Sequence, residues 1–357
     1  SNGVGMGHLT RSFAVAKRLP DNVEPVFLTL SKAFGIVQDA GIHAEYLPFH
    51  KATKTDIDEW NAFLNLEIKA ALAFHKPDVF VFDGNMPYAG LLTALDDFPN
   101  LWRVWMRRGM WAPDSGLDAM KRTSAFHAVL EPGDIAEHWD RGPTSLDKSK
   151  TIPLDPIRYL SGSDMQSRRK ARLEIGLPND GLAVLLQLGS GNNFDMSTMQ
   201  KFVLDRLTKV PDLKIVCADW LIGEQTPDLP DSVIRLKTFP LSRLFNAFDF
   251  AVGAVGYNSY HEVLHTGLPT LFVPNQNPQQ DEQHLRAKYA ALKGMAHVAF
   301  AHDLQTAQVA LDALLDAESR AEMRKLCIEN RRDNGAPAAA QYLTDLAFTR
   351  RQRFGET

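Results

Sequence analysis

Short apolar runs and helical stretches alternate along the whole chain. The runs are rich in branched and aromatic residues, and between them apolar residues recur at helical spacing, as in residues 9–19, 57–75, 196–209 and 283–292. Near-continuous apolar strands separated by helices indicate parallel sheets covered on both faces, with ligands bound beyond the carboxyl ends of the strands. The predicted strands are residues 25–30, 44–49, 79–83, 101–106, 125–131, 182–188, 214–218, 233–236, 250–255 and 270–273.

A break in this pattern divides the chain in two. Residues 154–164 carry proline, glycine and serine after the last strand-like segment of the first half, and residues 182–188 start a second sheet. With 357 residues the chain is long enough for two separate cores. We therefore predict an α/β protein with two doubly wound domains, residues 1–158 and 159–336, on either side of a cleft. The tail, residues 337–357, looks helical and amphipathic and is expected to pack back on the first domain.

Charge and cysteine content argue against several functions. The net charge of −4 and the pI near 6.3 give no general attraction to nucleic acid or anionic lipid. The only cysteines, Cys217 and Cys327, each lie in an apolar context, which indicates structural thiols rather than a disulfide or metal ligands. No apolar run reaches the length of about eighteen residues that a membrane span needs. We expect a cytoplasmic protein, at most peripheral at the inner membrane face, with no nucleic-acid partner and no bound metal.

A glycine turn opens the chain. Gly5 and Gly7 permit positive φ and close approach of the backbone to a ligand on the acceptor side, and His8 follows at the start of the first helix. Neutral imidazole accepts a proton near pH 7, so His8 is a candidate general base, with Asp83 at the end of a predicted strand to orient it. The alternative is that His8 only caps the turn. Because only two residues precede the turn, the first strand of the first domain is expected to be missing from this sequence.

A second glycine turn follows the first strand of the second half. It contains Gly189, Ser190, Gly191 and Asn192, directly after residues 182–188. These residues could wrap a phosphate on the donor side of the cleft. The alternative is a tight strand-to-helix turn without a ligand.

The most informative segment joins a strand to a short helix that ends at Gly267. The first-turn amides of such a helix point outward, and the helix dipole adds roughly half a positive charge there, so the segment can bind an anion. An acidic residue one turn into the helix could reach the hydroxyls of a sugar or ribose. A nucleoside diphosphate needs this combination of groups. The residues of this segment that are predicted to bind the nucleoside diphosphate are Gly256, Tyr257, Asn258, Ser259 and Glu262.

Two further segments supply candidate ligands. Glu282 and Gln283 follow a strand and a polar loop, where they could bind sugar hydroxyls; the alternative role for Glu282 is to cap the next helix. Arg107 and Arg108 end a tryptophan-rich run and could meet an anionic or lipid-linked acceptor. The favoured reading of that run is a buried strand whose arginines pair with carboxylates. Arg11, one helical turn after the first histidine, is interpreted as structural.

As an ordered set these motifs resemble a known family. The segment 256–262, the turn 267–269 and the pair at 282–283 resemble the donor-binding signature of UDP-glycosyltransferases, and the two glycine turns resemble those of the MurG-like branch. The resemblance implies the GT-B fold, two facing Rossmann-like domains with the donor held by the second. Ala254 departs from the pattern, because plant-type members carry a phosphate-binding histidine there, and no counterpart of their uracil-stacking tryptophan is found.

The resemblance also implies roles for individual residues. Glu262 would hold the ribose hydroxyls, Asn258 and Ser259 the diphosphate, and Glu282 with Gln283 the donor sugar. The backbone at Phe239 would contact the base, and His8 would deprotonate the acceptor.

The implied activity is hexosyl transfer from a nucleotide-diphosphate sugar, UDP-linked by resemblance, to an acceptor hydroxyl. The reaction would invert the anomeric centre and would need neither a metal nor a cofactor beyond the nucleotide-sugar co-substrate. The acceptor, a small molecule or a lipid-linked one, stays unassigned. Three alternatives remain open: a nucleotide-sugar hydrolase in which His8 activates water, a non-hydrolysing epimerase, and a non-catalytic donor-binding subunit.

Overall fold

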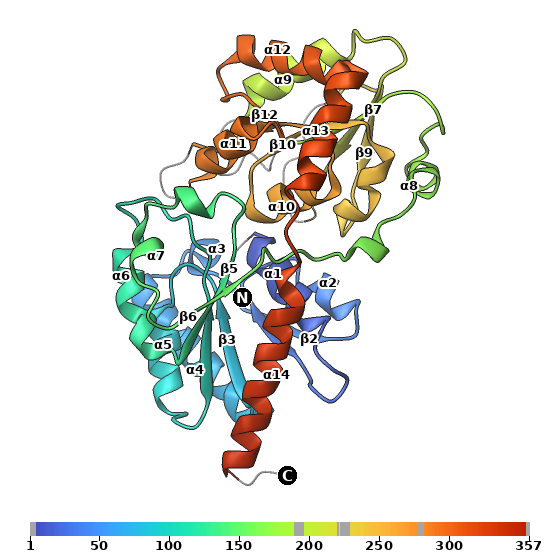
Figure 1. The fold of residues 1–357 in the computed structure, drawn as a ribbon. Helices are drawn as coiled ribbons and strands as arrows, with labels where there is room; N and C mark the ends of the chain where they lie inside the picture. The colour runs from blue at the N-terminus through green and yellow to red at the C-terminus, as the bar shows by residue number, and fades with distance from the viewer. Residues whose placement is uncertain (1–4, 189–195, 220, 222–228, 277–281, 355–357) are drawn as a thin grey trace. The chain divides into compact units, whose positions relative to one another are not determined.

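The chain divides into two compact α/β units (Figure 1). The computed structural model describes residues 5–188, 196–219, 221, 229–276 and 282–354. The first unit consists of Ser1–Tyr159 with Asn334–Thr357, and the second of Leu160–Asp333. All strand pairs in both units are parallel, as the uninterrupted apolar runs predicted. Among the residues described, no helix is long and apolar enough to cross a membrane.

Two separate sheets form the first unit. One pairs β1 with β2, and the other has the order β3-β4-β5-β6. The core between the larger sheet and its helices is built around Trp105, Trp60 and Phe126, which are almost fully buried. The strands are β1 (Val26–Thr29), β2 (His43–Tyr46), β3 (Val79–Asp83), β4 (Trp102–Met106), β5 (Ala128–Pro132) and β6 (Thr151–Leu154).

Helices of unequal length cover these sheets. The longest of those before residue 150, α4 (Ile57–His75), follows Asp56, whose side chain accepts a hydrogen bond from the Asp58 amide at 2.8 Å. It packs closely on α5 because Gly90 lies against Asn61: a Cβ at Gly90 would come within 2.1 Å of the Asn61 carbonyl oxygen. The other helices before residue 150 are α1 (Gly7–Ala16), α2 (Gly35–Gln38), α3 (His50–Thr53), α5 (Ala89–Asp96), α6 (Leu117–Lys121) and α7 (Pro143–Leu146), with 3-10 turns η1 (Arg122–Ala125) and η2 (Glu137–Trp139).

An apolar cavity of about 390 Å³ separates the two sheets of the first unit. Phe27 on β1 and Phe80 on β3 line it from the two strands, and Val15 of α1 and Ile68 of α4 line it from the helices. Neither β1 nor β3 pairs with another described strand on the side that borders the cavity.

The last helix, α14 (Gly335–Phe354), belongs to the first unit. It contacts α1, β3, β4 and β6, and Figure 1 shows it as the long red helix. Asp78, just before β3, ties its end in place: Arg350 Nη1 lies 2.6 Å and Arg351 Nε 2.9 Å from the two carboxylate oxygens. Where the chain re-enters the unit, the Asn334 side chain accepts from the Arg158 amide and donates to the Arg158 carbonyl, each at 3.0 Å.

The second unit contains one six-stranded sheet of order β12-β11-β10-β7-β8-β9. From β7 the chain proceeds outward to β9, then returns to β10 beside β7 and proceeds outward on the other side. This is the doubly wound order, with a switch point between β7 and β10. The strands are β7 (Ala183–Gln187), β8 (Lys214–Ala218), β9 (Val233–Leu236), β10 (Phe250–Ala254), β11 (Thr270–Val273) and β12 (His297–Val298).

Buried Arg172 fixes the entry to this sheet. It lies on α8 and donates to the carbonyls of Pro178, Gly181 and Ala247 and to the Asp249 carboxylate at 2.8–3.0 Å. These bonds hold the turn before β7 and the turn before β10 together. The helices of the unit are α8 (Arg168–Ile175), α9 (Ser197–Leu207), α10 (Tyr257–Thr266), α11 (Gln283–Leu292), α12 (Leu304–Leu315) and α13 (Ala317–Glu329), with 3-10 turns η3 (Gly162–Asp164) and η4 (Leu241–Ala247).

Several predicted boundaries were wrong by a few residues. The strand expected at 44–49 ends at Tyr46, and Pro48, which has no amide hydrogen to donate, lies just beyond. The strand expected from residue 125 begins at Ala128, because residues 122–125 form η1. The helix expected over residues 9–19 is α1, which ends at Ala16.

Candidate active site

His8 and Asp83 meet in the first unit. His8 is the second residue of α1 and Asp83 ends β3, and the Nδ1 and Oδ1 atoms lie 2.7 Å apart. The His8 side chain remains 17% exposed, whereas that of Asp83 is 1% exposed. The contact predicted between the two residues is therefore present, with the imidazole at the surface and the carboxylate beneath it.

Two more residues of α1 fix the Asp83 carboxylate. Arg11 forms an ion pair with Oδ1 and donates from Nε to Oδ2 at 3.0 Å, and the Ser12 hydroxyl donates to Oδ2 at 3.0 Å. Arg11 is buried, as a structural residue would be, but its partner is the same carboxylate that contacts His8. Sequence reasoning missed the joint role of Arg11 and Ser12. Their spacing of three and four residues from His8, which places all three on one helix face, was the available signal.

The charges around Asp83 determine the state of His8. Burial opposes the negative charge of Asp83, but the Arg11 guanidinium and the His8 hydrogen bond hold the pKa of this carboxyl well below its usual range. An ionised carboxylate only accepts hydrogen bonds, so the 2.7 Å contact with Asp83 favours the tautomer with the proton on Nδ1 and the lone pair on Nε2; the contact of Nδ1 with Arg11 Nη2, which can only donate, is longer at 3.0 Å. Burial lowers the pKa of His8 below 6.5, against the raising effect of Asp83, and Arg11 and Arg108 lower it further. His8 is thus a neutral imidazole at pH 7, with Nε2 able to accept a proton.

The glycines before His8 leave open space. A Cβ at Gly5 or Gly7 would meet no atom of the described residues within 4 Å. Neither glycine is among the described residues with positive φ. The absence of a side chain at these two positions leaves space just before His8 in the chain.

The two predicted acceptor-side arginines differ in their surroundings. Arg107 is buried: its guanidinium lies 3.6 Å from the Glu131 carboxylate and donates to the Asp147 carbonyl at 3.3 Å. This arrangement agrees, for Arg107, with the favoured interpretation of a strand-end arginine paired with a carboxylate. Arg108 is half-buried and close enough to His8 to lower its pKa. Of the two, only Arg108 lies beside the His8–Asp83 pair.

In the second unit, the predicted donor segment lies at the switch point of the sheet. The strand β10 is central, and α10 begins three residues after it, with Gly256 as the residue that precedes the helix. The carboxyl ends of β7 and β10 therefore border the position where doubly wound sheets bind their ligands. The predicted ligands Gly189, Ser190, Gly191 and Asn192 follow β7 but lie outside the described residues.

The helix α10 presents its predicted ligands on one face. Asn258, Ser259 and Glu262 are partly exposed and lie within one turn of each other, whereas Tyr257 and Tyr260 are buried. No side chain caps the helix at Gly256, and the first hydrogen bond of the helix runs from the Tyr260 amide to the Gly256 carbonyl at 2.9 Å. A Cβ at Gly256 would meet no described atom within 4 Å. The space beside Gly256, at the positive end of the helix dipole, is thus open among the described residues.

The buried face of α10 locks the helix onto its neighbours. The Tyr257 ring packs on His261, with ring centroids 4.4 Å apart. The guanidinium carbon of Arg286, on α11, lies over the Tyr257 ring at 5.8 Å from its centroid. Because the Tyr257 side chain is used in this packing, only its backbone remains for the predicted ligand contact. Gly267 ends the helix as predicted, with φ of 72° and its amide donating to the Val263 carbonyl at 3.0 Å.

The remaining predicted ligands lie around the same edge of the sheet. Glu282 is partly exposed at the start of α11, and its side chain makes no capping hydrogen bond with the helix. Gln283 is buried, and its side-chain oxygen accepts from the Asn275 amide at 3.3 Å, so it anchors the loop after β11. Phe239 is half-buried between β9 and η4, and η4 packs on α10. Ala254 ends β10, at the position where the resemblance would have a histidine.

No family model matches the sequence, and no curated protein matches it significantly. Solved structures do match over nearly the whole chain. MurG of Acinetobacter baumannii is 14% identical with a TM-score of 0.64, and the match covers 96% of this chain and 98% of MurG. The chain has the GT-B fold. The glycosyltransferase VinC in complex with dTDP is 16% identical with a TM-score of 0.60, covering 98% of each chain. A putative UDP-N-acetylglucosamine 2-epimerase from Listeria monocytogenes is 10% identical with a TM-score of 0.66, covering 97% of this chain and 95% of that one.

Proposed function

We propose that the protein is a glycosyltransferase that moves a sugar from a nucleoside-diphosphate donor to an acceptor hydroxyl. The observation that carries the proposal is the state of His8: Asp83 orients it through Nδ1 and leaves Nε2 as a proton acceptor near neutral pH. The predicted donor segment at the switch point of the second sheet supports it independently.

The donor is proposed to bind the second unit through its diphosphate. The amides that open α10, with the side chains of Asn258 and Ser259, would hold the phosphates, and Glu262 on the same face would accept from the ribose hydroxyls. Glu282 would bind the sugar, and the backbone at Phe239 the base. The names of two structures that share the fold include dTDP and a UDP-sugar, which supports this class of donor. Uridine as the base rests on the resemblance of the sequence motifs.

In the proposed reaction, the acceptor hydroxyl oxygen attacks the anomeric carbon of the donor sugar while His8 Nε2 accepts the hydroxyl proton. The bond from that carbon to the diphosphate breaks, and its electron pair leaves with the nucleoside diphosphate. A single displacement of this kind inverts the anomeric centre. The dipole of α10 would stabilise the negative charge that develops on the leaving group, which is where preorganised sites gain most of their rate. The proposal requires no metal or cofactor in this step.

A donor panel tests the proposal. The protein is incubated with UDP- and dTDP-sugars, with and without pooled acceptor alcohols and lipid-linked acceptors, and free nucleotide and free sugar are measured separately. Nucleotide release that depends on acceptor supports transfer and should persist in EDTA. Free sugar formed without acceptor would instead assign a hydrolase in which the same imidazole activates water. A chain that binds donors but turns over none of them would be a donor-binding subunit, and the transferase proposal would be wrong.

A further inference from the structure

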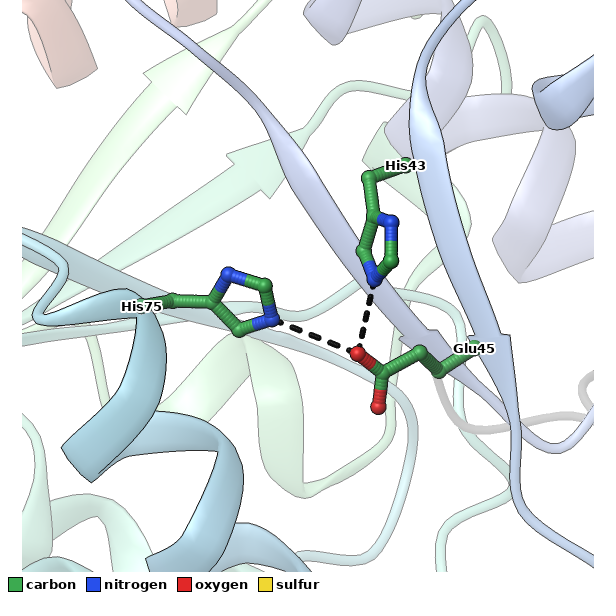
Figure 2. A group of neighbouring side chains, drawn as sticks. All are labelled: His43, Glu45 and His75. Atoms are coloured by element: carbon green, nitrogen blue, oxygen red, sulfur yellow. Dashed lines mark hydrogen bonds and ion pairs between the residues drawn. The ribbon is translucent and has the colours of Figure 1, made fainter.

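Three side chains that the proposed reaction does not use converge on the surface of the first unit. His43 Nε2 lies 2.7 Å and His75 Nε2 3.2 Å from the same oxygen, Oε1 of Glu45 (Figure 2). The two imidazole rings are 5.2 Å apart between centroids. Among the described residues, this is the one group of three or more histidine, cysteine or acidic side chains whose ligand atoms come together, all within 4.8 Å.

The fold places these side chains together from two elements. His43 and Glu45 are two residues apart on β2, so they project from the same face of the strand. His75 is the last residue of α4, which stops there because Lys76 adopts a left-handed conformation, with φ of 46°. Ile68 and Leu72 are buried on the same helix and hold its last turns against the core. One of the three side chains therefore comes from a helix held against the core, and the other two come from a strand.

The chemistry of the group is that of a transition-metal site. Two imidazoles and one carboxylate form one of the ligand sets that bind zinc with a fourth position left open. Zinc bonds of about 2.0–2.2 Å place tetrahedral ligand atoms roughly 3.3–3.6 Å apart, so each imidazole nitrogen needs to move only slightly away from Glu45 Oε1, from 2.7 and 3.2 Å. The side chains are 52%, 40% and 18% exposed for His43, Glu45 and His75, so an ion with water as its fourth ligand can reach them. We propose that these three residues bind a divalent transition-metal ion of the zinc class.

The site would act as a clamp. The strand β2 belongs to the small sheet, which does not pair with β3, and the cavity between the sheets is lined by His75 itself. A metal ion held by both elements would link the small sheet to α4, which packs on α5 and the larger sheet. Its expected effect is therefore on the stability of the first unit and not on sugar transfer.

Zinc titration of the metal-stripped full chain tests the proposal. Isothermal titration calorimetry with zinc chloride should show one ion bound per chain. His43→Ala, His75→Ala and Glu45→Gln should each weaken binding by at least about tenfold, since even the loss of an outer-shell partner costs 10–100-fold. His138→Ala, which removes another exposed histidine of the same unit, is the matched control and should bind zinc like the unmodified chain. Cobalt(II) should give the visible absorption of a tetrahedral site in the unmodified chain and in His138→Ala, but not in the three site variants.

Thermal unfolding separates lost binding from lost folding. Zinc should raise the Tm of the unmodified chain with increasing concentration, because an ion that binds only the folded state stabilises it. Without zinc, the three variants should have Tm values close to that of the unmodified chain. Zinc should not raise the Tm of any of them. The proposal is overturned by an absence of saturable binding at excess zinc, or by binding that the His75 and Glu45 variants leave unchanged. Neither result would bear on the donor-panel assay, so the two proposals fail separately.

Discussion

At the scale of single residues, one carboxylate organises the candidate acceptor site. Asp83 contacts three side chains of α1: Arg11 is buried, whereas His8 and Ser12 are partly exposed. A buried carboxylate with one cationic partner and one imidazole partner is the arrangement that orients a histidine base and fixes its tautomer. Removing the imidazole should therefore affect proton transfer and little else.

His8→Ala is expected to lower kcat by about 10²–10⁴-fold, the usual contribution of a positioned general base. Donor binding should be nearly unchanged, because the predicted donor ligands belong to the second unit. Initial rates with a saturating donor and calorimetric binding of the nucleotide diphosphate measure the two effects. Unchanged turnover in this variant would remove His8 from the mechanism.

The pH dependence follows from the lowered pKa of His8. The base works in its neutral form, so kcat/KM should be level near pH 7 and should fall as the pH drops through the His8 pKa, which lies below 6.5. Burial is the main cause of the lowered value, and Arg11 and Arg108 add to it. A profile of kcat/KM from pH 5 to pH 8 locates this fall, which is the acidic limb of the profile. The residual activity of His8→Ala should lack the acidic limb. A limb centred above pH 7 would contradict the assignment.

At the scale of elements, α10 and the switch point of the second sheet define the candidate donor site. The helix keeps one face for packing, with Tyr260 and His261 almost fully buried, and leaves the other partly exposed. The packed face fixes the direction of the helix, and this direction aims its positive end beyond the carboxyl edge of β10. Ligand contacts on the exposed face should therefore be separable from folding.

Glu262→Ala is expected to weaken nucleotide-diphosphate binding by about 10–100-fold, the effect of losing a charged hydrogen-bond partner of about 1.5–3 kcal/mol. The Tm should change little because the side chain lies on the exposed face of α10. Glu329→Ala, an exposed glutamate at the end of α13, is the matched control and should bind like the unmodified chain. Equal affinities of the two variants would exclude Glu262 from the donor site.

At the scale of the whole molecule, the two units differ in how the chain builds them. The second unit is one continuous segment with its own core, which includes Val252, Leu271 and Leu311. The first unit needs both ends of the sequence, because α14 returns to contact α1 and the larger sheet and is held by Asp78. Only the second unit should therefore fold as an isolated fragment.

Residues 160–333 expressed alone are expected to unfold cooperatively and to bind the nucleotide diphosphate with an affinity close to that of the full chain. Residues 1–333, which lack α14, should lose protection from exchange in the first unit, because the apolar surfaces of α1 and β3 lose their cover. Hydrogen exchange and calorimetry on the two fragments measure both effects. A fragment 160–333 that is unfolded or does not bind nucleotide would contradict this division of tasks.

The sequence by itself determined the fold class, because uninterrupted apolar strands that alternate with helices are typical of parallel sheets buried on both faces. It also determined the strands over residues 79–83, 214–218, 233–236 and 270–273, where clear turn residues flank an apolar run. Helices as short as α2, α3, α6 and α7 were not predicted, since four or five residues are too few to show a helical period.

Only the tertiary structure decided which polar groups meet. The contact of His8 with Asp83 was predicted, because Asp83 was expected at the end of a strand and His8 at the start of the helix after a glycine turn. Which carboxylate lies beside Arg107, and the burial of Gln283, depend instead on the neighbouring elements, and no local pattern encodes this. The same reason explains His43, Glu45 and His75: a strand and a helix distant in sequence bring them together, and their ligand geometry exists only after packing.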